Sequence, residues 1–430
     1  MNRIFVFLLV AGLLFLIDSY VWQAVRAVSR GLSETAQRTI GYIYWGFTGL
    51  ALLAYIALQI LPPDMLGRMT RTFVMTGIVM PYLAKIFAVL FIAADDAGRL
   101  VRWAIAKFSQ PRTAVETGSP SSSSTLSSLS SSPPISRSDF LMKTALVAGT
   151  VPLIGFTYGI VSGAHDYRVR RIKLPLKNLP SGFNGLKIAQ LSDIHSGSFF
   201  NKTAVKGGVE MLLSEKPDLV FFTGDLVNSK AEEVRDYISI FDKVKAPMGV
   251  FSTLGNHDYG DYAEWPSAEA KRRNLNDLKA AHKQMGWNLM MDENYILETN
   301  GDKIALVGVQ NWGAGARWPK YGDLAKALRG AEDYPVKLLL SHDPSHWEAQ
   351  VRPEFPEIDV MFAGHTHGMQ FGIETELFRW SPSQYAYKQW AGLYEEGDQR
   401  LYVNRGYGYI GYPGRVGILP EVTIFELVKA

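Results

Sequence analysis

The sequence predicts transmembrane α-helices in the N-terminal third of the chain and an α/β domain in the remainder. Four long apolar runs precede residue 164, and each approaches the roughly 17–25 residues that a bilayer core requires. Beyond residue 164, five short apolar runs end in Asp, Asn or His residues. Short apolar runs that end at turn residues are typical of buried strands. With 430 residues, the chain is long enough for two domains.

The long apolar runs predict four membrane spans, over residues 4–21, 40–61, 73–94 and 144–161. Trp22 and Trp45 lie near the ends of runs, where interfacial aromatic residues are common. Buried helices of a soluble domain are the alternative, but four such runs in one third of a chain favour a membrane. Asp18 and Lys85 lie inside the runs. An ionisable residue within a span raises a functional hypothesis, although we favour a structural role for both.

A Ser/Pro-rich segment separates the third run from the fourth. Such a composition cannot bury a core and indicates a flexible linker, here over residues 113–139. The linker follows a membrane domain over residues 1–112 that contains three transmembrane helices. A fourth transmembrane helix or signal-anchor is predicted over residues 140–163, and the α/β domain over residues 164–430.

The segment before the fourth run suggests an orientation. Residues 136–143 read SRSDFLMK, which resembles a twin-arginine export signal with its second arginine replaced by Ser138. The basic residues of the loops divide almost equally between the two sides and do not decide the orientation. We therefore predict a multi-pass protein of the inner (cell) membrane with its α/β domain on the periplasmic, external side. A cytoplasmic α/β domain is the alternative.

The five short runs carry their polar residues at their C-terminal ends, which is where ligands bind in open α/β sheets. These residues are Asp193-Ile194-His195, Gly224-Asp225, Gly255-Asn256-His257-Asp258, His342 and Gly364-His365-Thr366-His367. Five of the chain's 8 histidines belong to this set. Structural histidines scattered through a core would rarely gather in this way, so the pattern predicts a site.

The residue types indicate a centre with two divalent cations. Carboxylates and imidazoles are ligands for such ions, and a bridging carboxylate holds two of them roughly 3.5–4 Å apart. A pair of this kind activates water and neutralises phosphate charge. The chain has no cysteine, which excludes thiolate zinc sites and cysteine nucleophiles. It also lacks a P-loop and a GxSxG elbow. A net charge of +3 is too small to indicate a nucleic-acid partner.

The motif order DxH, GD, GNHD, His and GHxH resembles that of the calcineurin-like metallophosphoesterase superfamily, over roughly residues 186–426. The resemblance implies a four-layer α/β/β/α sandwich, whereas periodicity alone indicates only α/β. It implies two divalent metal ions, and Mn, Fe and Zn all suit the ligand set. The ligands implied are Asp193, His195 and His367 for the first ion, Asn256, His342 and His365 for the second, and Asp225 as the bridge.

The resemblance also implies two catalytic residues. His257 would contact the phosphate and protonate the leaving oxygen, and Asp258 would orient the ring of His257. An imidazole suits this role because it titrates near the operating pH.

Within the superfamily, the chain is similar to a membrane-associated bacterial branch that includes the Bacillus cell-wall phosphodiesterase. The similarity lies in the runs at residues 365–370 and 404–408 and in Arg415. Met369 stands where that branch more usually has Gly. Arg415 is a candidate substrate-binding residue, and pairing with a surface carboxylate is the alternative for it.

Together these features predict a membrane-anchored, metal-dependent phosphoric ester hydrolase. Its expected partners are the lipid bilayer and a phosphodiester or pyrophosphate from a lipid, a lipid-linked sugar or a wall polymer. One alternative is a cytoplasm-facing enzyme that resembles UDP-2,3-diacylglucosamine pyrophosphatases. Another is a transporter or receptor with a silent phosphoesterase scaffold, which the complete set of motif residues disfavours.

Overall fold

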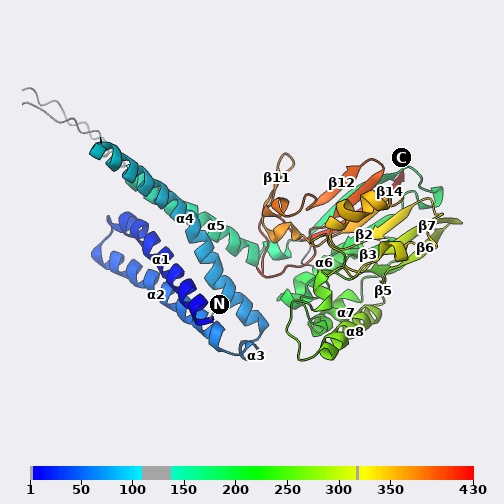
Figure 1. Cartoon of the computed structure of the whole chain (residues 1–430), viewed down its shortest axis with the longest axis horizontal. Helices are drawn as coiled ribbons and strands as arrows, with labels where there is room; N and C mark the ends of the chain where they lie inside the picture. The colour runs from blue at the N-terminus through cyan, green and yellow to red at the C-terminus, as the bar shows by residue number, and fades with distance from the viewer. Residues whose placement is uncertain (1–2, 109–136, 316–318) are drawn as a thin grey trace, which may run out of the picture. The chain divides into compact units, whose positions relative to one another are not determined.

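The computed structural model describes residues 3–108, 137–315 and 319–430, which fall into two compact units (Figure 1). The first unit comprises Met1–Gly155 and the second Phe156–Ala430. Most of the predicted Ser/Pro linker lies outside the described residues. The second unit begins inside the fourth long helix, ahead of the domain boundary predicted at residue 164.

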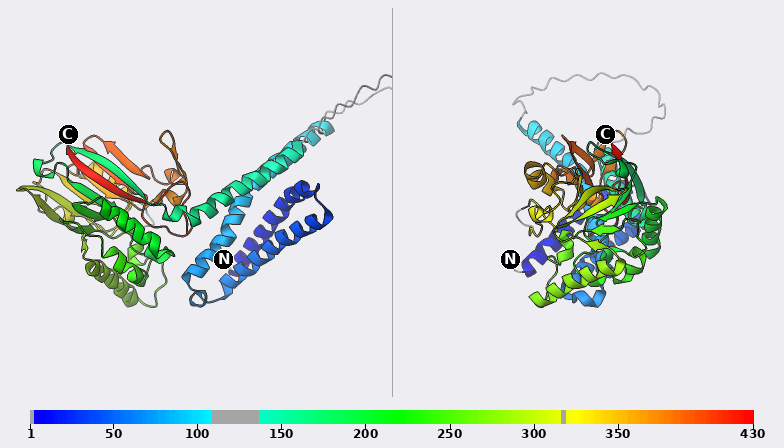
Figure 2. Two further views of the ribbon diagram at one scale, coloured as in Figure 1. Left: turned by 180° about the vertical axis from the view of Figure 1, so that it is seen from behind. Right: turned by 90° about the vertical axis from the view of Figure 1, so that its right-hand side faces the viewer.

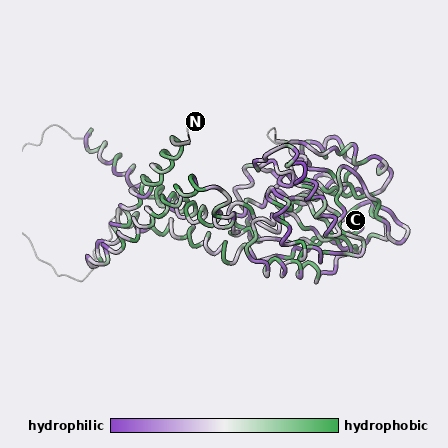
Figure 3. The backbone as a smooth tube through the Cα atoms, turned by 90° about the horizontal axis from the view of Figure 1, so that it is seen from below, coloured by the Kyte–Doolittle hydropathy of each residue, from purple (hydrophilic) through white to green (hydrophobic). Residues whose placement is uncertain are grey.

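The four predicted spans are confirmed as helices that are long and apolar enough to cross a membrane. They are α1 (Arg3–Ser29), α2 (Glu34–Ile60), α4 (Arg68–Phe108) and α5 (Arg137–Val161), with the short α3 (Pro63–Leu66) between α2 and α4. The hydrophobic colour in Figure 3 follows much of their length. Ser33 caps α2, because its side chain accepts the backbone N–H of Ala36 at 3.3 Å.

A buried polar cluster joins three of these helices. Asp18 of α1 is fully buried and pairs with Lys85 of α4. Its carboxylate also accepts hydrogen bonds from Thr48 at 2.8 Å and from Tyr82 at 2.5 Å. Tyr44 donates to the backbone oxygen of Asp18 at 2.9 Å. Because the charges of Asp18 and Lys85 satisfy each other and the carboxylate has further donors, the structure supports a structural role for this pair.

The second unit contains two six-stranded sheets and a small hairpin. The first sheet has, in spatial order, β1 (Arg168–Leu176), β14 (Glu421–Lys429), β2 (Lys187–Leu191), β3 (Leu219–Phe222), β4 (Val250–Ser252) and β5 (Asn288–Leu289). The second has β12 (Gly392–Glu396), β13 (Gln399–Val403), β9 (Val360–Ala363), β8 (Lys337–Leu340), β7 (Asp302–Gly308) and β6 (Glu293–Thr299). The hairpin pairs β10 (Ile373–Glu374) with β11 (Arg379–Trp380).

Helices complete the unit. The α-helices are α6 (Lys202–Ser214), α7 (Ile238–Phe241), α8 (Ala268–Met285), α9 (Leu324–Ala327) and α10 (Arg352–Glu354). The 3₁₀ turns are η1 (Gly163–His165), η2 (Ser181–Phe183), η3 (Ser196–Ser198), η4 (Ala231–Tyr237), η5 (Asn256–Tyr259), η7 (His367–Gln370) and η8 (Pro382–Tyr385), and η6 (Trp347–Val351) is a π-helical turn. Figure 1 shows α6, α7 and α8 on one side of the strands, and Figure 2 shows β14 in red beside β1.

The two sheets pack face to face through aromatic side chains. The ring centroids of Phe221 on β3 and Phe362 on β9 are 5.1 Å apart, and those of Phe362 and Phe425 on β14 are 5.0 Å apart. A second core lies between the first sheet and α6 and α8, and a third between the second sheet and its helices. The predicted four-layer α/β/β/α sandwich is therefore confirmed.

The five short apolar runs form β2, β3, β4, β8 and β9. β2, β3 and β4 run parallel in the first sheet, and β8 and β9 run parallel in the second. Parallel strands bring their carboxyl ends to one edge of a sheet. The polar residues that follow these strands are thereby gathered at one place.

The last turns of α5 belong to the second unit. The hydroxyl of Tyr412 donates to the backbone oxygen of Phe156, and the backbone N–H of Arg415 donates to that of Gly159 at 3.1 Å. A Cβ on Gly163 would lie 2.0 Å from the backbone oxygen of Arg415, so only glycine permits this approach. The segment around Arg415 is therefore held against the end of α5.

The polar cluster of the membrane unit predicts a rescue by double substitution. Lys85→Met alone leaves the buried carboxylate of Asp18 without its cation, which costs about 3–5 kcal/mol. Combining it with Asp18→Asn removes the charge and keeps an oxygen for Thr48 and Tyr82. We expect the melting temperature of the detergent-solubilised protein to fall in the single variant and largely to recover in the double variant. Lys107→Met, at the exposed end of α4, is the control; a double variant as unstable as Lys85→Met would contradict the prediction.

Candidate metal centre

The loops after the strands turn sharply at the residues predicted to form the site. Asp193, His195, Asp225, His365 and His367 all have positive φ angles, of 52°, 47°, 60°, 73° and 50°. Non-glycine residues adopt this left-handed conformation rarely and at some energetic cost, and such residues tend to cluster at functional sites. The turns allow side chains from separate strands to point at a common centre.

One group of candidate ligands consists of Asp193, His195 and His367, whose ligand atoms all lie within 4.8 Å of one another. Asp193 Oδ1 is 3.2 Å from His367 Nε2. The Nε2 atoms of His195 and His367 are buried and have no hydrogen-bond partner in the described parts of the chain. Desolvation lowers the pKa of both histidines. Neutral, unpaired imidazole nitrogens beside a carboxylate are the donor set of a divalent cation.

The second group consists of Asp225, His342 and His365, with Asn256 beside them. Asn256 Oδ1 is 2.8 Å from His365 Nδ1 and 3.2 Å from His342 Nε2. Asp225 Oδ2 is 3.1 Å from His342 Nε2 and 3.5 Å from His195 Nε2. Asp225 therefore stands between the two groups, in the position that a bridging carboxylate requires.

The protonation of His342 depends on the carboxylates beside it. Its Nδ1 pairs with the backbone oxygen of Thr223 at 2.7 Å, which directs Nε2 toward Asp225. Desolvation alone would lower the pKa of His342, but the carboxylates of Asp225 and Asp193 raise it to about 10. A cation that binds at Nε2 must displace this proton.

Glycines at the motif positions make room for the two carboxylates. A Cβ on Gly255 would lie 2.2 Å from Asp225 Oδ1, and a Cβ on Gly364 would lie 2.1 Å from Asp193 Oδ2. No side chain fits at either distance. The glycines that precede Asn256 and His365 are thus required by close packing against the site.

The structure corrects the role predicted for Asp258. Its buried carboxylate accepts the backbone N–H groups of Asp225, Leu226 and Gly255, each at 2.9 Å. It joins the loops after β3 and β4 and does not orient the ring of His257. That ring is held by the backbone oxygen of Asn228, 2.8 Å from Nδ1.

The structure also corrects the expectations for Arg415. Its side chain is fully buried, and Nη2 donates to the backbone oxygens of Arg405 at 2.8 Å and Gly408 at 2.5 Å. The same atom is 3.0 Å from Nδ1 of His367. Desolvation lowers the pKa of Arg415 to about 10. This burial supports neither contact with a substrate phosphate nor pairing with a surface carboxylate, because no part of the guanidinium is exposed.

Three residues of the site were not found from the sequence. Asn228 Oδ1 is 2.9 Å from Nδ1 of His195, the hydroxyl of Tyr387 is 2.6 Å from Nε2 of His365, and Asn256 donates to the hydroxyl of Tyr262 at 2.8 Å. Asn228 follows Asp225 by three residues, and this proximity is a signal that sequence reasoning could have used. The tyrosines stand in loops without a distinguishing pattern.

The protonation of His342 predicts that metal binding releases protons. Because the ligand must be neutral, Mn²⁺ should bind with release of about one proton near pH 7, and its affinity should fall as the pH falls. Calorimetric titration of the metal-free protein in two buffers with different ionisation heats measures this number. Equal heats in the two buffers would show that His342 is already neutral.

The sequence matches two family models. Residues 2–164 match "Probable Calcineurin-like phosphoesterase, transmembrane domain", and residues 186–369 match "Calcineurin-like phosphoesterase". The four long helices thus precede a catalytic domain of known type, and the second match contains the residues of both candidate ligand groups.

Curated relatives of the chain have names that refer to a metallophosphoesterase or a phosphodiesterase. A "Transmembrane protein with metallophosphoesterase domain" of Danio rerio is 30% identical over 279 residues, which are 64% of this chain and 60% of that protein. The chain thus spans about 60% of the length of that relative. The "Uncharacterized metallophosphoesterase YkuE" of Bacillus subtilis is 28% identical over 304 residues, 68% of this chain and 98% of that protein. The "Phosphodiesterase YaeI" of Escherichia coli is 28% identical over 299 residues, 68% of this chain and 100% of that protein.

These matches agree with the sandwich fold, the strand-end motifs and the four apolar helices. The family uses divalent metals and hydrolyses phosphate esters. Together the two family matches and these relatives support a membrane-associated metallophosphoesterase.

Proposed function

We propose that the protein is a dinuclear phosphodiesterase that acts on a lipid or another envelope substrate at a membrane. The observation that carries this proposal is the position of Asp225 between two groups of ligands, with His257 next to both. A single-metal site would not need a carboxylate that faces histidines of two groups.

The proposed ligands of one ion are Asp193, His195 and His367, and those of the other are Asn256, His342 and His365, with Asp225 shared. Two divalent ions in these positions would activate a water molecule and neutralise charge on the phosphate. Mn, Fe and Zn all suit this mixture of carboxylate, amide and imidazole.

His257 is the proposed proton donor. Its backbone N–H donates to Asp225 Oδ1 at 2.9 Å, which places its ring beside the bridging carboxylate. The backbone oxygen of Asn228 can only accept, so Nδ1 of His257 carries a hydrogen. The proton on Nε2 of the imidazolium form is then available to the leaving alcohol oxygen as its bond to phosphorus breaks.

The membrane helices support a substrate at or near a bilayer. The fourth span continues into the catalytic unit, because Phe156–Val161 of α5 belong to both. The likeness of residues 136–143 to an export signal supports placement in the inner (cell) membrane with the domain on the periplasmic side.

The role of His257 predicts a dependence on the leaving group. His257→Gln should lower kcat about 10²–10⁴-fold on an alkyl phosphodiester, whose leaving alkoxide needs a proton. The loss should be much smaller on bis(p-nitrophenyl) phosphate, because nitrophenolate leaves without protonation. Activity of the full chain in detergent with Mn²⁺ is the measurement, and metal content should stay at the wild-type level.

Two further variants complete this experiment. Asp225→Asn should lose both metal and activity, whereas Asp236→Asn, at an exposed carboxylate on η4, should lose neither. An equal loss on both esters in His257→Gln would contradict the role of His257. Wild-type activity that chelation does not abolish would contradict the dinuclear proposal.

The proposed orientation can be tested by cysteine labelling, because the chain has no native cysteine. Lys206→Cys lies on α6 of the catalytic unit and is exposed, and Arg30→Cys lies between α1 and α2. With four spans these positions face opposite sides. A membrane-impermeant maleimide should label Lys206→Cys in intact spheroplasts and Arg30→Cys only after lysis. The reverse pattern would place the domain in the cytoplasm.

A further inference from the structure

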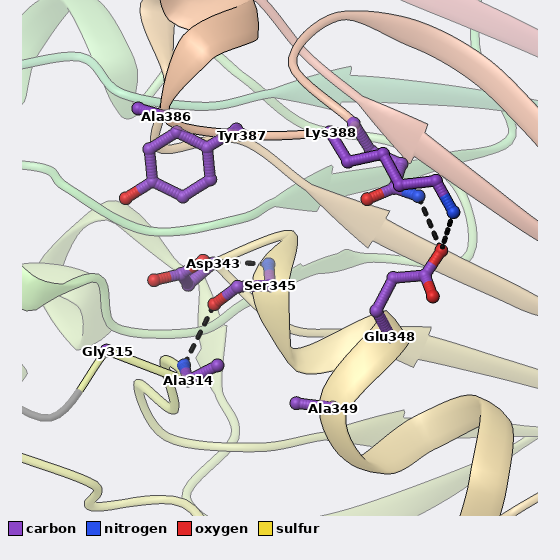
Figure 4. Close-up of a pocket in the computed structure, with 10 residues that line it drawn as sticks. Ala314, Gly315, Asp343, Ser345, Glu348, Ala349, Ala386, Tyr387 and Lys388 are labelled. Atoms are coloured by element: carbon purple, nitrogen blue, oxygen red, sulfur yellow. Dashed lines mark hydrogen bonds and ion pairs between the residues drawn. The ribbon is translucent and has the colours of Figure 1, made fainter.

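A pocket of about 650 Å³ opens beside the second ligand group of the catalytic unit. Figure 4 shows the ring of Tyr387 on one side of this space and Asp343 and Ser345 on the side opposite. Glu348, Lys388 and Gln389 also line the pocket. None of the functions assigned above uses this pocket.

The pocket adjoins a proposed metal ligand. The hydroxyl of Tyr387 is 2.6 Å from Nε2 of His365, and Asp343 Oδ2 is 3.7 Å from the same nitrogen. Asp343 directly follows His342 in the chain. A phosphate held at the metal centre would therefore have one of its two alcohol substituents within reach of the pocket.

The wall nearest the metal centre offers both an acceptor and donors. Asp343 is 3% exposed; its Oδ1 accepts the backbone N–H of Ser345 at 2.8 Å, and its Oδ2 accepts no hydrogen bond in the described residues. Ser345 accepts the backbone N–H of Ala314 at 2.9 Å, and its own hydroxyl hydrogen has no acceptor among the described residues. Gly313 makes room for the carboxylate, because a Cβ there would lie 2.4 Å from Asp343 Oδ2.

Tyr387 supplies another donor. Nδ1 of His365 faces Asn256 Oδ1 and Nε2 of His342, which is the side of the ligand group. When Nδ1 acts as the ligand, Nε2 carries the hydrogen and donates it to the oxygen of Tyr387. The phenolic hydrogen of Tyr387 is then left to donate into the pocket.

The charges of the pocket disfavour a second phosphate. The carboxylate of Glu348 is 3.0 Å from Lys388 Nζ and 3.0 Å from Arg352 Nη1, so both cations are already paired, and it also accepts a hydrogen bond from the amide of Gln389 at 2.6 Å. Asp343 is the carboxylate of the lining that lacks a lysine or arginine partner among the described residues. An anionic group in the pocket would therefore be repelled by the uncompensated negative charge of Asp343.

We propose that this pocket recognises a polyol substituent of the phosphodiester, such as glycerol or a sugar. A hydroxyl group both donates and accepts, so it can donate to Asp343 Oδ2 and accept from Ser345 or Tyr387. An ammonium group would satisfy only the carboxylate, and an alkyl group would leave all three unpaired. The inference rests on the proposed phosphodiesterase function and assigns its substrate class.

The test compares matched esters on the full chain in detergent with Mn²⁺. Glycerol p-nitrophenyl phosphate carries the hydroxyls, and propyl p-nitrophenyl phosphate has the same chain length without them. The wild-type kcat/KM ratio should favour glycerol by at least about 10-fold, because a site that hydrogen-bonds hydroxyls discriminates against analogues that lack them. The preference should lie mainly in KM.

Substitutions then show whether Asp343 and Ser345 recognise the hydroxyl groups of the substrate. In Asp343→Ala and in Ser345→Ala the ratio should fall toward 1, and in Asp236→Asn it should remain at the wild-type value. The ratio compares two substrates on the same preparation, so incomplete folding or metal loading of a variant does not change it. A wild-type preference that survives in both pocket variants would overturn the proposal, because the hydroxyls would then be recognised elsewhere.

Further substrates distinguish failure of the pocket assignment from failure of the proposed function, and a lipid headgroup from a soluble phosphodiester. Activity on bis(p-nitrophenyl) phosphate without preference for the glycerol ester would overturn the pocket assignment and leave the phosphodiesterase intact. Inactivity on every diester would overturn the function itself. Phosphatidylglycerol in vesicles and soluble glycerophosphoglycerol distinguish a lipid headgroup from a free phosphodiester, and preference for either supports polyol recognition.

Discussion

The carboxylate of Asp225 is the point at which the two sheets and the two ligand groups meet. It follows β3 of the first sheet, yet its Oδ2 lies 3.1 Å from His342, which follows β8 of the second. Its Oδ1 accepts the backbone N–H of His257, and its own N–H donates to Asp258. Concentrating ligands around one buried carboxylate is costly without cations, because anionic and imidazole groups lose their hydration there. The packed sheets supply the free energy that holds this arrangement together.

Two buried charged groups near this centre are satisfied chiefly by backbone atoms. Asp258 is surrounded by N–H donors, and Arg415 by carbonyl acceptors. Each of these side chains is hydrogen-bonded to backbone atoms of more than one loop residue. It therefore restricts the backbone conformation of the loops directly. The left-handed backbone conformations at the site are strained, and they persist because these hydrogen bonds restrain the loops that contain them.

Strands and motifs could be predicted because they depend on local patterns. An apolar run that ends at a glycine or an aspartate shows both the strand and the place of its polar residue, as β3 and Asp225 illustrate. The roles of Asp258 and Arg415 could not be predicted in this way. Each depends on which backbone atoms of distant loops come within reach, and sequence pattern contains no information on that geometry. Tyr387 was missed for the same reason, because its contact with His365 joins two loops.

The attachment of α5 has a consequence for release of the catalytic unit by proteolysis. Cleavage after η1 would remove the backbone oxygens of Phe156 and Gly159, which accept hydrogen bonds from Tyr412 and Arg415. Each donor left unpaired costs about 1–3 kcal/mol wherever water cannot replace its partner. The segment that loses these hydrogen bonds includes Arg415, whose Nη2 lies 3.0 Å from Nδ1 of His367. A shed catalytic unit would thus hold the Asp193 group less rigidly, so that separation from the membrane would itself lower metal occupancy.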